Sequence, residues 1–276
     1  DRLPTMENHS HKKVLFILLH FFAFECCFTN GVEWNCASST NTGTFTRSTN
    51  CTISGSDHVS VLNTLEIVGT NTDMNNLITI TAASKHRHFY LNNANAKLIL
   101  RYLKLVGGDV SSYGSSASYG GSILIYTNGG ELNLYSSIVF NNKAKSGGGI
   151  YAQGASSTNK NAIMNIYNSI IQNNEATPGG GGGIYIFNAV ATIYNTTIDY
   201  NQASSDGGGM RIDSSDVTMK NTIISNNNAY GGGGLSIEGD SSTVTLRQSS
   251  FINNDATNNG DEIYTCLLYT SDAADE

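Results

Sequence analysis

The chain has 276 residues, a formal net charge of −7 and only 13% charged residues, about half the share that is usual in globular domains. So few charges argue against a helical bundle, the 39% hydrophobic content argues against general disorder, and the acidic balance gives no electrostatic basis for binding nucleic acid. With 29 Gly and 33 Asn against 15 Lys plus Arg, the composition favours a β-rich fold whose turns are formed by Gly and Asn.

The first 30 residues are predicted to be a leader. Residues 1–5 look like translated upstream sequence, and Met6 is followed by Lys12, Lys13 and an apolar run over 14–24. A basic segment before a short apolar one is typical of a secretory signal peptide, so we assign residues 6–30 to it and expect a secreted or cell-surface protein. A signal anchor is the alternative, but the run is short for a membrane span, and we expect no other span.

Residues 31–96 are predicted to form an N-terminal cap and irregular first coils of a repeated structure. Cys36 and Cys51 are the two cysteines outside the leader and the tail, and in a secreted protein such a pair is expected to form a disulfide. The bond would close a short loop and stabilise the fold by about 3 kcal/mol. The sequon Asn50-Cys-Thr makes Asn50 the preferred glycosylation acceptor, because the other sequon, at Asn195, falls at a position that the repeat would pack.

A repeat organises residues 97–265. The pattern apolar-x-[Asn/Ser/Gln]-x-x-apolar-x-x-Asn-x-Ala occurs five times, and its equivalent Asn residues are 32, 27, 26 and 27 residues apart. Each unit contains three short β-like runs separated by Asn or Gly corners, and it is too short for a βαβ crossover with a second strand. Such a unit buries its apolar side only against copies of itself, so we predict an all-β parallel solenoid with 26–27 residues per coil.

Stacking the units aligns fifteen apolar residues in three inward columns, about 4.8 Å apart along each column. The columns are Leu134/Ile166/Ile193/Met219/Leu246, Val139/Ile171/Ile198/Ile224/Phe251 and Ile150/Ile184/Met210/Leu235/Ile263.

The Asn residues of the repeat are predicted to form a ladder of side-chain amides at one corner. Each amide donates and accepts, so a stacked column satisfies itself while its residues tolerate a left-handed backbone. The ladder consists of Asn142, Asn174, Asn201, Asn227 and Asn254, and a second, partial column of Ser136, Asn168, Asn195, Asn221 and Gln248. Glycine runs before the third strand supply positive φ and allow close approach.

The repeat resembles those of a known family. Phe251-Ile-Asn-Asn254, Ile198-Asp-Tyr-Asn201 and the Gly-Gly-x-Ile elements resemble the FxxN and GGA[ILV] repeats of chlamydial polymorphic outer-membrane proteins, with the Ala replaced by Gly. More broadly, residues 98–265 resemble the right-handed parallel β-helices of the pectin-lyase-like superfamily. The tail, residues 266–276, resembles a translated sequencing adapter and is treated as non-native.

The pectin-lyase-like resemblance implies a possible enzyme site, because those enzymes use carboxylates, often with Ca²⁺, and an Arg or Lys base. The best local match places Glu238 and Asp240 one coil above Asp213 and Asp216. A solvated turn edge is the favoured interpretation, so no catalytic residue and no cofactor other than Ca²⁺ is expected. The alternative catalytic set is Arg211, Asp213, Asp216, Lys220, Glu238 and Asp240.

Two further features are candidates for binding. Lys85-His-Arg-His88 offers metal or anion ligands, although an exposed loop is the favoured interpretation. An outward stripe of tyrosines is a candidate platform for sugar rings or protein partners, with ordinary strand-surface pairing as the alternative. It consists of Tyr135, Tyr167 and Tyr194, followed by Lys220 and Arg247, and of Tyr151 and Tyr185 on another strand set.

The leading hypothesis is a non-catalytic secreted or cell-surface protein that acts in adhesion and binds an extracellular polysaccharide or protein. A polysaccharide lyase or hydrolase is the rival hypothesis, and a purely structural spacer is the third.

Overall fold

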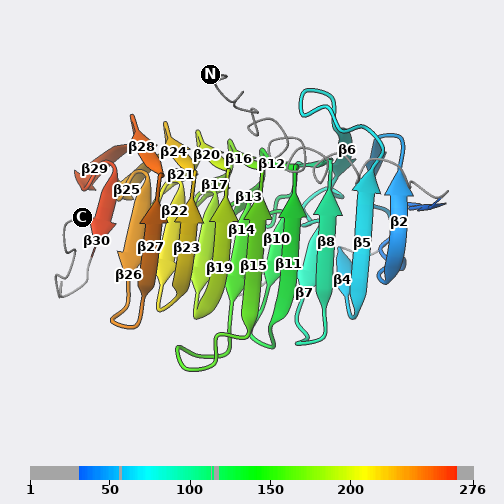
Figure 1. The fold of residues 1–276 in the computed structure, drawn as a ribbon, viewed down its shortest axis with the longest axis horizontal. Helices are drawn as coiled ribbons and strands as arrows, with labels where there is room; N and C mark the ends of the chain where they lie inside the picture. The colour runs from blue at the N-terminus through cyan, green and yellow to red at the C-terminus, as the bar shows by residue number, and fades with distance from the viewer. Residues whose placement is uncertain (1–30, 56–57, 113, 115–117, 266–276) are drawn as a thin grey trace, which may run out of the picture. The chain divides into compact units, whose positions relative to one another are not determined.

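Residues 31–55, 58–112, 114 and 118–265 are described in a computed structural model. The predicted upstream residues, signal peptide and non-native tail lie outside this range. In the described part, the chain contains no α-helix and winds as an all-β, right-handed parallel β-helix, in which each coil contributes at most one strand to each of four sheets (Figure 1).

Four parallel sheets form the walls of the β-helix, and we number them in the order in which their strands follow one another along one coil. Among the described residues, sheet 1 has nine strands: β1 (Val32–Glu33), β2 (Gly43–Arg47), β5 (Thr64–Gly69), β8 (Lys97–Arg101), β11 (Gly130–Tyr135), β15 (Ala162–Tyr167), β19 (Ala189–Tyr194), β23 (Asp216–Lys220) and β27 (Thr243–Arg247). In the same range, sheet 2 has eight: β3 (Cys51–Thr52), β6 (Ile78–Thr81), β9 (Leu103–Val106), β12 (Ile138–Phe140), β16 (Ile170–Gln172), β20 (Thr197–Asp199), β24 (Ile223–Ser225) and β28 (Ser250–Ile252).

The other two sheets complete each coil. Of the described strands, sheet 3 has five short ones: β13 (Lys143–Ala144), β17 (Glu175–Ala176), β21 (Gln202–Ala203), β25 (Asn228–Gly231) and β29 (Asp255–Asn259). Sheet 4 has eight within these bounds: β4 (Val59–Val61), β7 (Phe89–Leu91), β10 (Ile123–Ile125), β14 (Ile150–Gln153), β18 (Ile184–Phe187), β22 (Met210–Asp213), β26 (Leu235–Glu238) and β30 (Ile263–Thr265). The parallel stacking therefore includes strands that precede the recognisable repeat.

The strand register confirms the three apolar columns. Leu134 pairs with Ile166, which pairs with Ile193, and the column continues through Met219 to Leu246. The columns of sheets 2 and 4 have the same in-register pairing. All members are fully buried except those of the last described coil, where Leu246 is 39% exposed. Burial of these columns is the main source of stability, because each coil covers the apolar edge of the one before it.

The ladder asparagines lie inside the β-helix and are almost fully buried. The Asn174 Nδ2 donates to Asn201 Oδ1 at 3.0 Å and to the Val139 carbonyl of the preceding coil at 3.1 Å. Asn142, Asn201 and Asn227 repeat this arrangement, and Asn254 donates to Glu262 in place of a further asparagine. Their backbone differs from the expectation, because the left-handed residue is the one before each ladder residue. These residues are Asn141, Asn173, Tyr200, Asn226 and Asn253, with φ of 51–54°.

The second column is left-handed throughout and supplies the first residue of the two-residue corner between sheets 1 and 2. Ser136, Asn168, Asn195, Asn221 and Gln248 have φ of 45–51°. The ladder residue and the left-handed residue differ for a simple reason. A ladder side chain must point inward to reach the next coil, so the residue before it takes the left-handed conformation that turns the chain.

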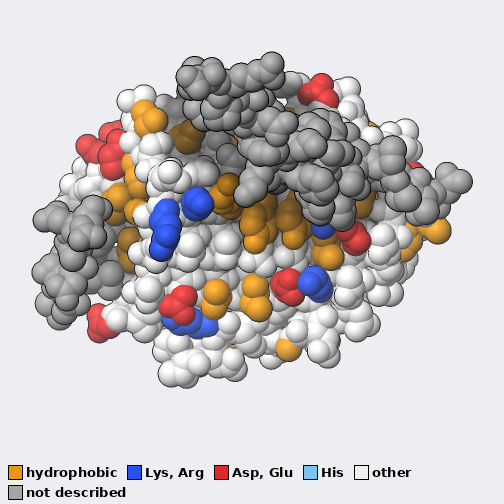
Figure 2. Space-filling view, viewed as in Figure 1, with side chains coloured by type: hydrophobic (Ala, Val, Ile, Leu, Met, Phe, Trp, Pro, Cys, Tyr) orange, Lys and Arg blue, Asp and Glu red, His pale blue; other side chains and the backbone are white. Residues whose placement is uncertain are grey.

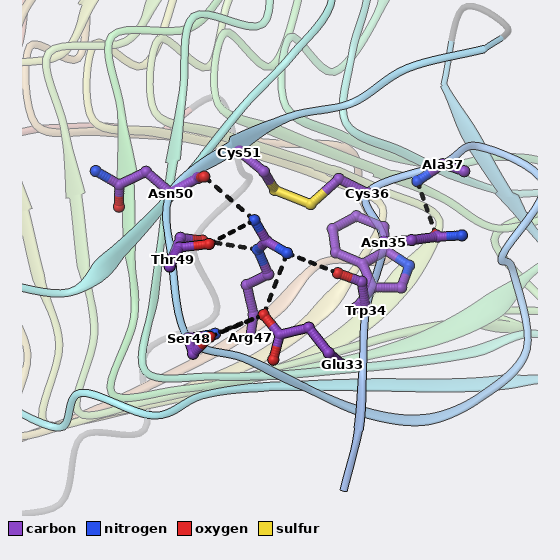
Figure 3. Close-up of polar contacts among 10 residues, drawn as sticks. All are labelled: Glu33, Trp34, Asn35, Cys36, Ala37, Arg47, Ser48, Thr49, Asn50 and Cys51. Carbon is purple, nitrogen blue, oxygen red and sulfur yellow. Dashed lines mark hydrogen bonds and ion pairs between the residues drawn. A yellow bond between two sulfur atoms is a disulfide. The ribbon is translucent and has the colours of Figure 1, made fainter.

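The N-terminal coil is closed by a covalent and a polar link (Figure 3). Cys36 and Cys51 form the expected disulfide, which joins positions 15 residues apart. The Arg47 guanidinium donates to the Trp34 carbonyl at 2.9 Å and to Glu33 Oε1 at 3.2 Å, and it also contacts the carbonyls of Thr49 and Asn50. Since these acceptors come from both ends of the loop, Arg47 fixes the loop that the disulfide closes.

Candidate functional site

The outer face of sheet 1 carries the predicted tyrosine stripe. Tyr135, Tyr167 and Tyr194 occupy the same register on β11, β15 and β19, and the row continues to Lys220 and Arg247. Arg101 on β8 precedes Tyr135 in the register. We call this set, Arg101, Tyr135, Tyr167, Tyr194, Lys220 and Arg247, the tyrosine row.

Two rings of the tyrosine row stack on one another. The rings of Tyr135 and Tyr167 are 5.2 Å apart with an interplanar angle of 9°, and the Arg101 guanidinium lies 4.0 Å from the centre of the Tyr135 ring. Both faces of Tyr135 and one face of Tyr167 are therefore occupied within the row, so a sugar ring has no free face of Tyr135 to stack on. The row offers ring edges, phenol hydroxyls and charges to a ligand.

The C-terminal end of the row holds cations that no carboxylate neutralises. Among the described residues, Lys220 and Arg247 are exposed and have no ion-pair partner, whereas Arg101 pairs with Glu66 at 3.2 Å. The Lys220 Nζ lies 5.8 Å from the ring centre of Tyr194, which is 37% exposed. This end is accessible and electropositive in a protein of net negative charge.

A second row crosses the same face near the N-terminal ends of the strands. Ile163 and Val190, paired in register, are 39% and 37% exposed. At its ends, Glu131 pairs with Lys97 at 3.0 Å, and Asp216 pairs with Lys160 at 2.8 Å. The rows are four residues apart along each strand, about 13 Å, and Figure 2 shows both on this face, separated by uncharged polar side chains. The carboxylates of the face are all paired, so the face as a whole is basic.

The alternative catalytic set divides into separate groups. Arg211 on β22 donates to Glu238 on β26 at 2.5 Å and lies 3.9 Å from Asp206. Asp213 is in register with Glu238, as expected. Burial acts to lower the pKa of Arg211, but Tyr185, Glu238 and Asp206 together raise it above its ordinary value. A guanidinium held in this way keeps its proton and cannot serve as a general base.

The other members of the set lie elsewhere. Asp216, the first residue of β23 on sheet 1, follows a left-handed corner at Ser214 and pairs with Lys160 in the loop 154–161. It is in register with Thr243, so Asp240 does not lie above it. The reason is the longer loop before β27, which holds four residues where the loop before β23 holds two. Lys220 lies at the opposite end of β23, beside Tyr194.

An open hollow of about 400 Å³ borders the Arg211 group and is lined by Asp206, Glu238, Gly239, Asp240 and Tyr264. Two of its three carboxylates face the Arg211 guanidinium. Across the residues that the structure describes, no three His, Cys, Asp or Glu side chains converge closely enough to hold a metal ion.

The second tyrosine set, on sheet 4, is not an exposed platform. Tyr151 is only 5% exposed, stacks on Tyr119 at 4.7 Å and meets the ring of Tyr185 at 5.0 Å. Burial raises the pKa of both phenols, that of Tyr185 to about 12. The Arg211 guanidinium, 5.1 Å from the Tyr185 ring, ends this stack. These tyrosines contribute to the packing of sheet 4, where Tyr185 is partly exposed.

Residues 85–88 are not an exposed loop throughout, as the sequence suggested. Arg87 is 5% exposed and His88 is fully buried. The Nε2 of His88 lies 3.1 Å from the Ile80 carbonyl oxygen, and its Nδ1 lies 3.1 Å from Ser122 Oγ. After the turn at Lys85, which has φ of 64°, the His88 side chain lies inside the coil, whereas the Arg87 guanidinium lies 5.7 Å from the centre of the Tyr90 ring.

The two sequon asparagines are both exposed. Asn50 Oδ1 accepts a hydrogen bond from the backbone N–H of Thr79 at 2.8 Å, and its side chain points away from Arg47 in Figure 3. The Nδ2 of Asn195 donates to Asn168 Oδ1 at 2.8 Å, so the second column is a surface feature rather than an internal ladder.

Comparisons with known proteins identify the fold. A family model described as "Right handed beta helix region" matches residues 121–273, more than half of the chain. No curated protein and no solved structure matches it. The part of the chain that the structure describes contains no helix long and apolar enough to cross a membrane.

Proposed function

Because the chain belongs to the right-handed β-helix family, whose coils present long flat sheets to solvent, we propose that it is a secreted or cell-surface binding protein. Its sheet 1 face would act in adhesion by binding an acidic extracellular polysaccharide without converting it. The observation that carries this proposal is the end of the tyrosine row, where Lys220, beside Tyr194, and Arg247 on the next coil are exposed and have no ion-pair partner among the described residues.

The spacing of the row suits a repeating ligand. Equivalent side chains on adjacent coils recur about every 4.8 Å, so an extended polymer lying across the strands meets a similar group at each coil. Phenol hydroxyls at Tyr135 and Tyr167 are hydrogen-bond donors and acceptors, and the cations favour carboxylate or sulfate groups. A polymer gains affinity by making several such contacts at once, none of which needs to be strong.

An acidic protein surface has the same charge, and a binding screen separates the two partners. The full chain would be titrated with polygalacturonate, a sulfated glycan, neutral cellulose oligosaccharides and an acidic protein, each at 50 and 300 mM salt. We expect binding to the acidic glycans only, weakening at high salt because the exposed charges are screened. Equal binding of neutral glycans, or binding of acidic proteins alone, would overturn the proposal.

Substitution of the cations tests the location. The double variant Lys220→Gln with Arg247→Gln should weaken binding of the acidic glycan at least tenfold, since charge-assisted contacts are lost. Lys104→Gln with Lys143→Gln is the matched control, because it removes the same charge from sheets 2 and 3. If both double variants bind equally, sheet 1 is not the site.

The rival hypothesis of a polysaccharide lyase or hydrolase is tested on the same samples. Release of unsaturated or reducing uronate from pectin and alginate would be followed with and without Ca²⁺. We expect no turnover, because Arg211 is held protonated and paired. Turnover that is lost in Asp213→Asn would establish the enzyme instead.

A further inference from the structure

The ladder asparagines donate to a column of backbone carbonyls, and the carbonyl that precedes this column accepts from a histidine instead. The carbonyls of Val139 and Leu105 accept from Asn174 and Asn142, at 3.1 and 3.4 Å. Leu105 is in register with Ile80 on β6, and the Ile80 carbonyl accepts instead from His88 at 3.1 Å. His88 thus performs, in the N-terminal coils, the bonding that Asn performs in the later ones.

The imidazole is neutral in this position. A carbonyl oxygen only accepts, so Nε2 carries the proton of the ring, and Nδ1 accepts from the hydroxyl of Ser122. Ser122 is fully buried as well. Both ring nitrogens are satisfied, and a second proton would place an uncompensated charge in the core.

We propose that His88 makes the N-terminal coils an acid-sensitive unit, which opens below neutral pH while the coils joined by the asparagine ladder stay closed. An amide side chain does not titrate, so the later coils have no equivalent group at this position of the core. Protonation also turns Nδ1 into a donor and removes the acceptor of Ser122.

The surroundings of His88 do not offset such a charge. The elements packed against it are its own segment 82–88, β4, β6, β7, β9, the corner 107–110 and the segment 118–122 that ends at Ser122. Burial is the largest influence on His88 and lowers its pKa to about 4, and only the carbonyls of Ile80 and Val106 act in the opposite direction. None of the titratable and charged groups on or beside these elements is among those influences; they are His58, Lys85, His86, Arg87, Tyr90, Lys104, Asp109 and Tyr119.

The sign and size of the effect follow from proton linkage. The ordinary pKa of 6.5 applies to the opened state and about 4 to the closed state, so only the opened state takes up the proton between these values. Lowering the pH from 7.5 to 5.0 should raise the opening constant of the N-terminal coils about 30-fold. The effect should reach about 300-fold below pH 4, where both states are protonated.

Hydrogen exchange of the full chain tests this, with intrinsic exchange rates corrected for pH. Peptides over β6 and β7 should show the 30-fold change between pH 7.5 and 5.0, and peptides over β18 and β22 should change less than threefold. The lowered carboxyl pKa values of Glu131 and Glu175 place their titration below pH 5.0. Uniform exchange behaviour in both regions would overturn the proposal.

Two measurements assign the effect to His88. His88→Gln retains a side-chain N–H donor without a titrating group, and it should abolish the pH response of β6 and β7. The C2-proton shift of His88 in the unaltered chain gives its titration directly and does not depend on whether the variant folds. A titration midpoint above pH 6, or an unchanged response in His88→Gln, contradicts the inference.

Discussion

Asn201 satisfies polar groups of three coils at once. Its Nδ2 donates to Asn227 Oδ1 and to the Ile171 carbonyl, while its Oδ1 accepts from both the backbone and the side chain of Asn174. At 1% exposure, none of these groups can turn to water instead. The ladder therefore contributes stability less through each bond than through the cost of leaving its partners unsatisfied.

Removal of one ladder amide should be strongly destabilising. Asn201→Ala leaves the N–H and Nδ2 of Asn174 without their acceptor, and we expect the free energy of unfolding to fall by about 3 kcal/mol. Urea unfolding with an unchanged m-value would measure it. The matched control is Gln202→Ala, an exposed neighbour, which should change stability by less than about 0.5 kcal/mol. Equal effects would mean that the ladder is not a stabilising element.

At the residue scale, the sequence predicts the column of asparagines but not its details. Nearly equal spacing in the chain is sufficient to stack Asn174 on Asn201 and Asn201 on Asn227, because every coil returns to the same place. Spacing does not say which of two adjacent residues turns the chain, so the left-handed conformation of Asn173 was not predicted. Nor does it reveal that His88 extends the acceptor column, since no repeated pattern surrounds that residue.

Glycine determines how closely the corner before sheet 4 approaches the backbone of sheet 3 and of the equivalent corner in the next coil. Behind sheet 3, Ala176, Ala203 and Ala229 form a small buried cluster of their own. A Cβ at Gly182 would lie 2.4 Å from the Gly208 oxygen and 2.5 Å from the Gln202 oxygen. Both contacts are with the backbone of the next coil, which cannot move without disturbing its own ladder of hydrogen bonds.

Gly182→Ala should therefore disrupt stacking locally. We expect a loss of about 3 kcal/mol or more, because the clash cannot be relieved by rotating a side chain. Thermal unfolding followed by circular dichroism would detect it as a lowered midpoint. Gly114→Ala is the control, since a Cβ there meets no atom within 4 Å. A variant as stable as this control would show that the corner is more open than described.

At the element scale, the repeat predicts strand register well and inserted loops poorly. The spacing of 32 between the first two ladder residues, against 27 for the next pair, shows that the coil between Asn142 and Asn174 is longer than the next. The structure places a loop at 154–161, from which the Lys160 Nζ reaches Asp216 at 2.8 Å and the Ser241 carbonyl at 3.2 Å. Periodicity carries no information about where an insertion points. It therefore did not predict that Lys160 in this loop pairs with Asp216, away from the group around Arg211.

The whole molecule is nearly one-dimensional in its interactions. Each strand pairs only with the equivalent strands of the coil before and the coil after it. Stability is then close to a sum of terms for single coils and for neighbouring pairs, and folding can tolerate changes in the number of coils. Lys160, which reaches two and three coils ahead, is an exception to this pattern.

Removal of one complete coil should thus preserve the fold. Deleting residues 196–221 joins Asn195 to Thr222, two corner residues that follow β19 and precede β24. The ladder then passes from Asn174 to Asn227, and β19 stacks on β27 with Ile193 opposite Leu246. We expect one cooperative unfolding transition with an m-value about a tenth lower, in proportion to the surface removed. The lost pair between Lys160 and Asp216 adds at most about 1 kcal/mol of destabilisation, because Asp216 is half exposed.

A deletion of similar length that breaks the period is the control. Without residues 196–215, β19 would run directly into β23, and that coil would lack its strands of sheets 2, 3 and 4. The apolar columns of the flanking coils would then face a gap, which costs their burial on both sides. We expect this protein to aggregate or to unfold without cooperativity. If the two deletions behave alike, coils do not act as independent stacking units, and the register alone does not explain the stability of the β-helix.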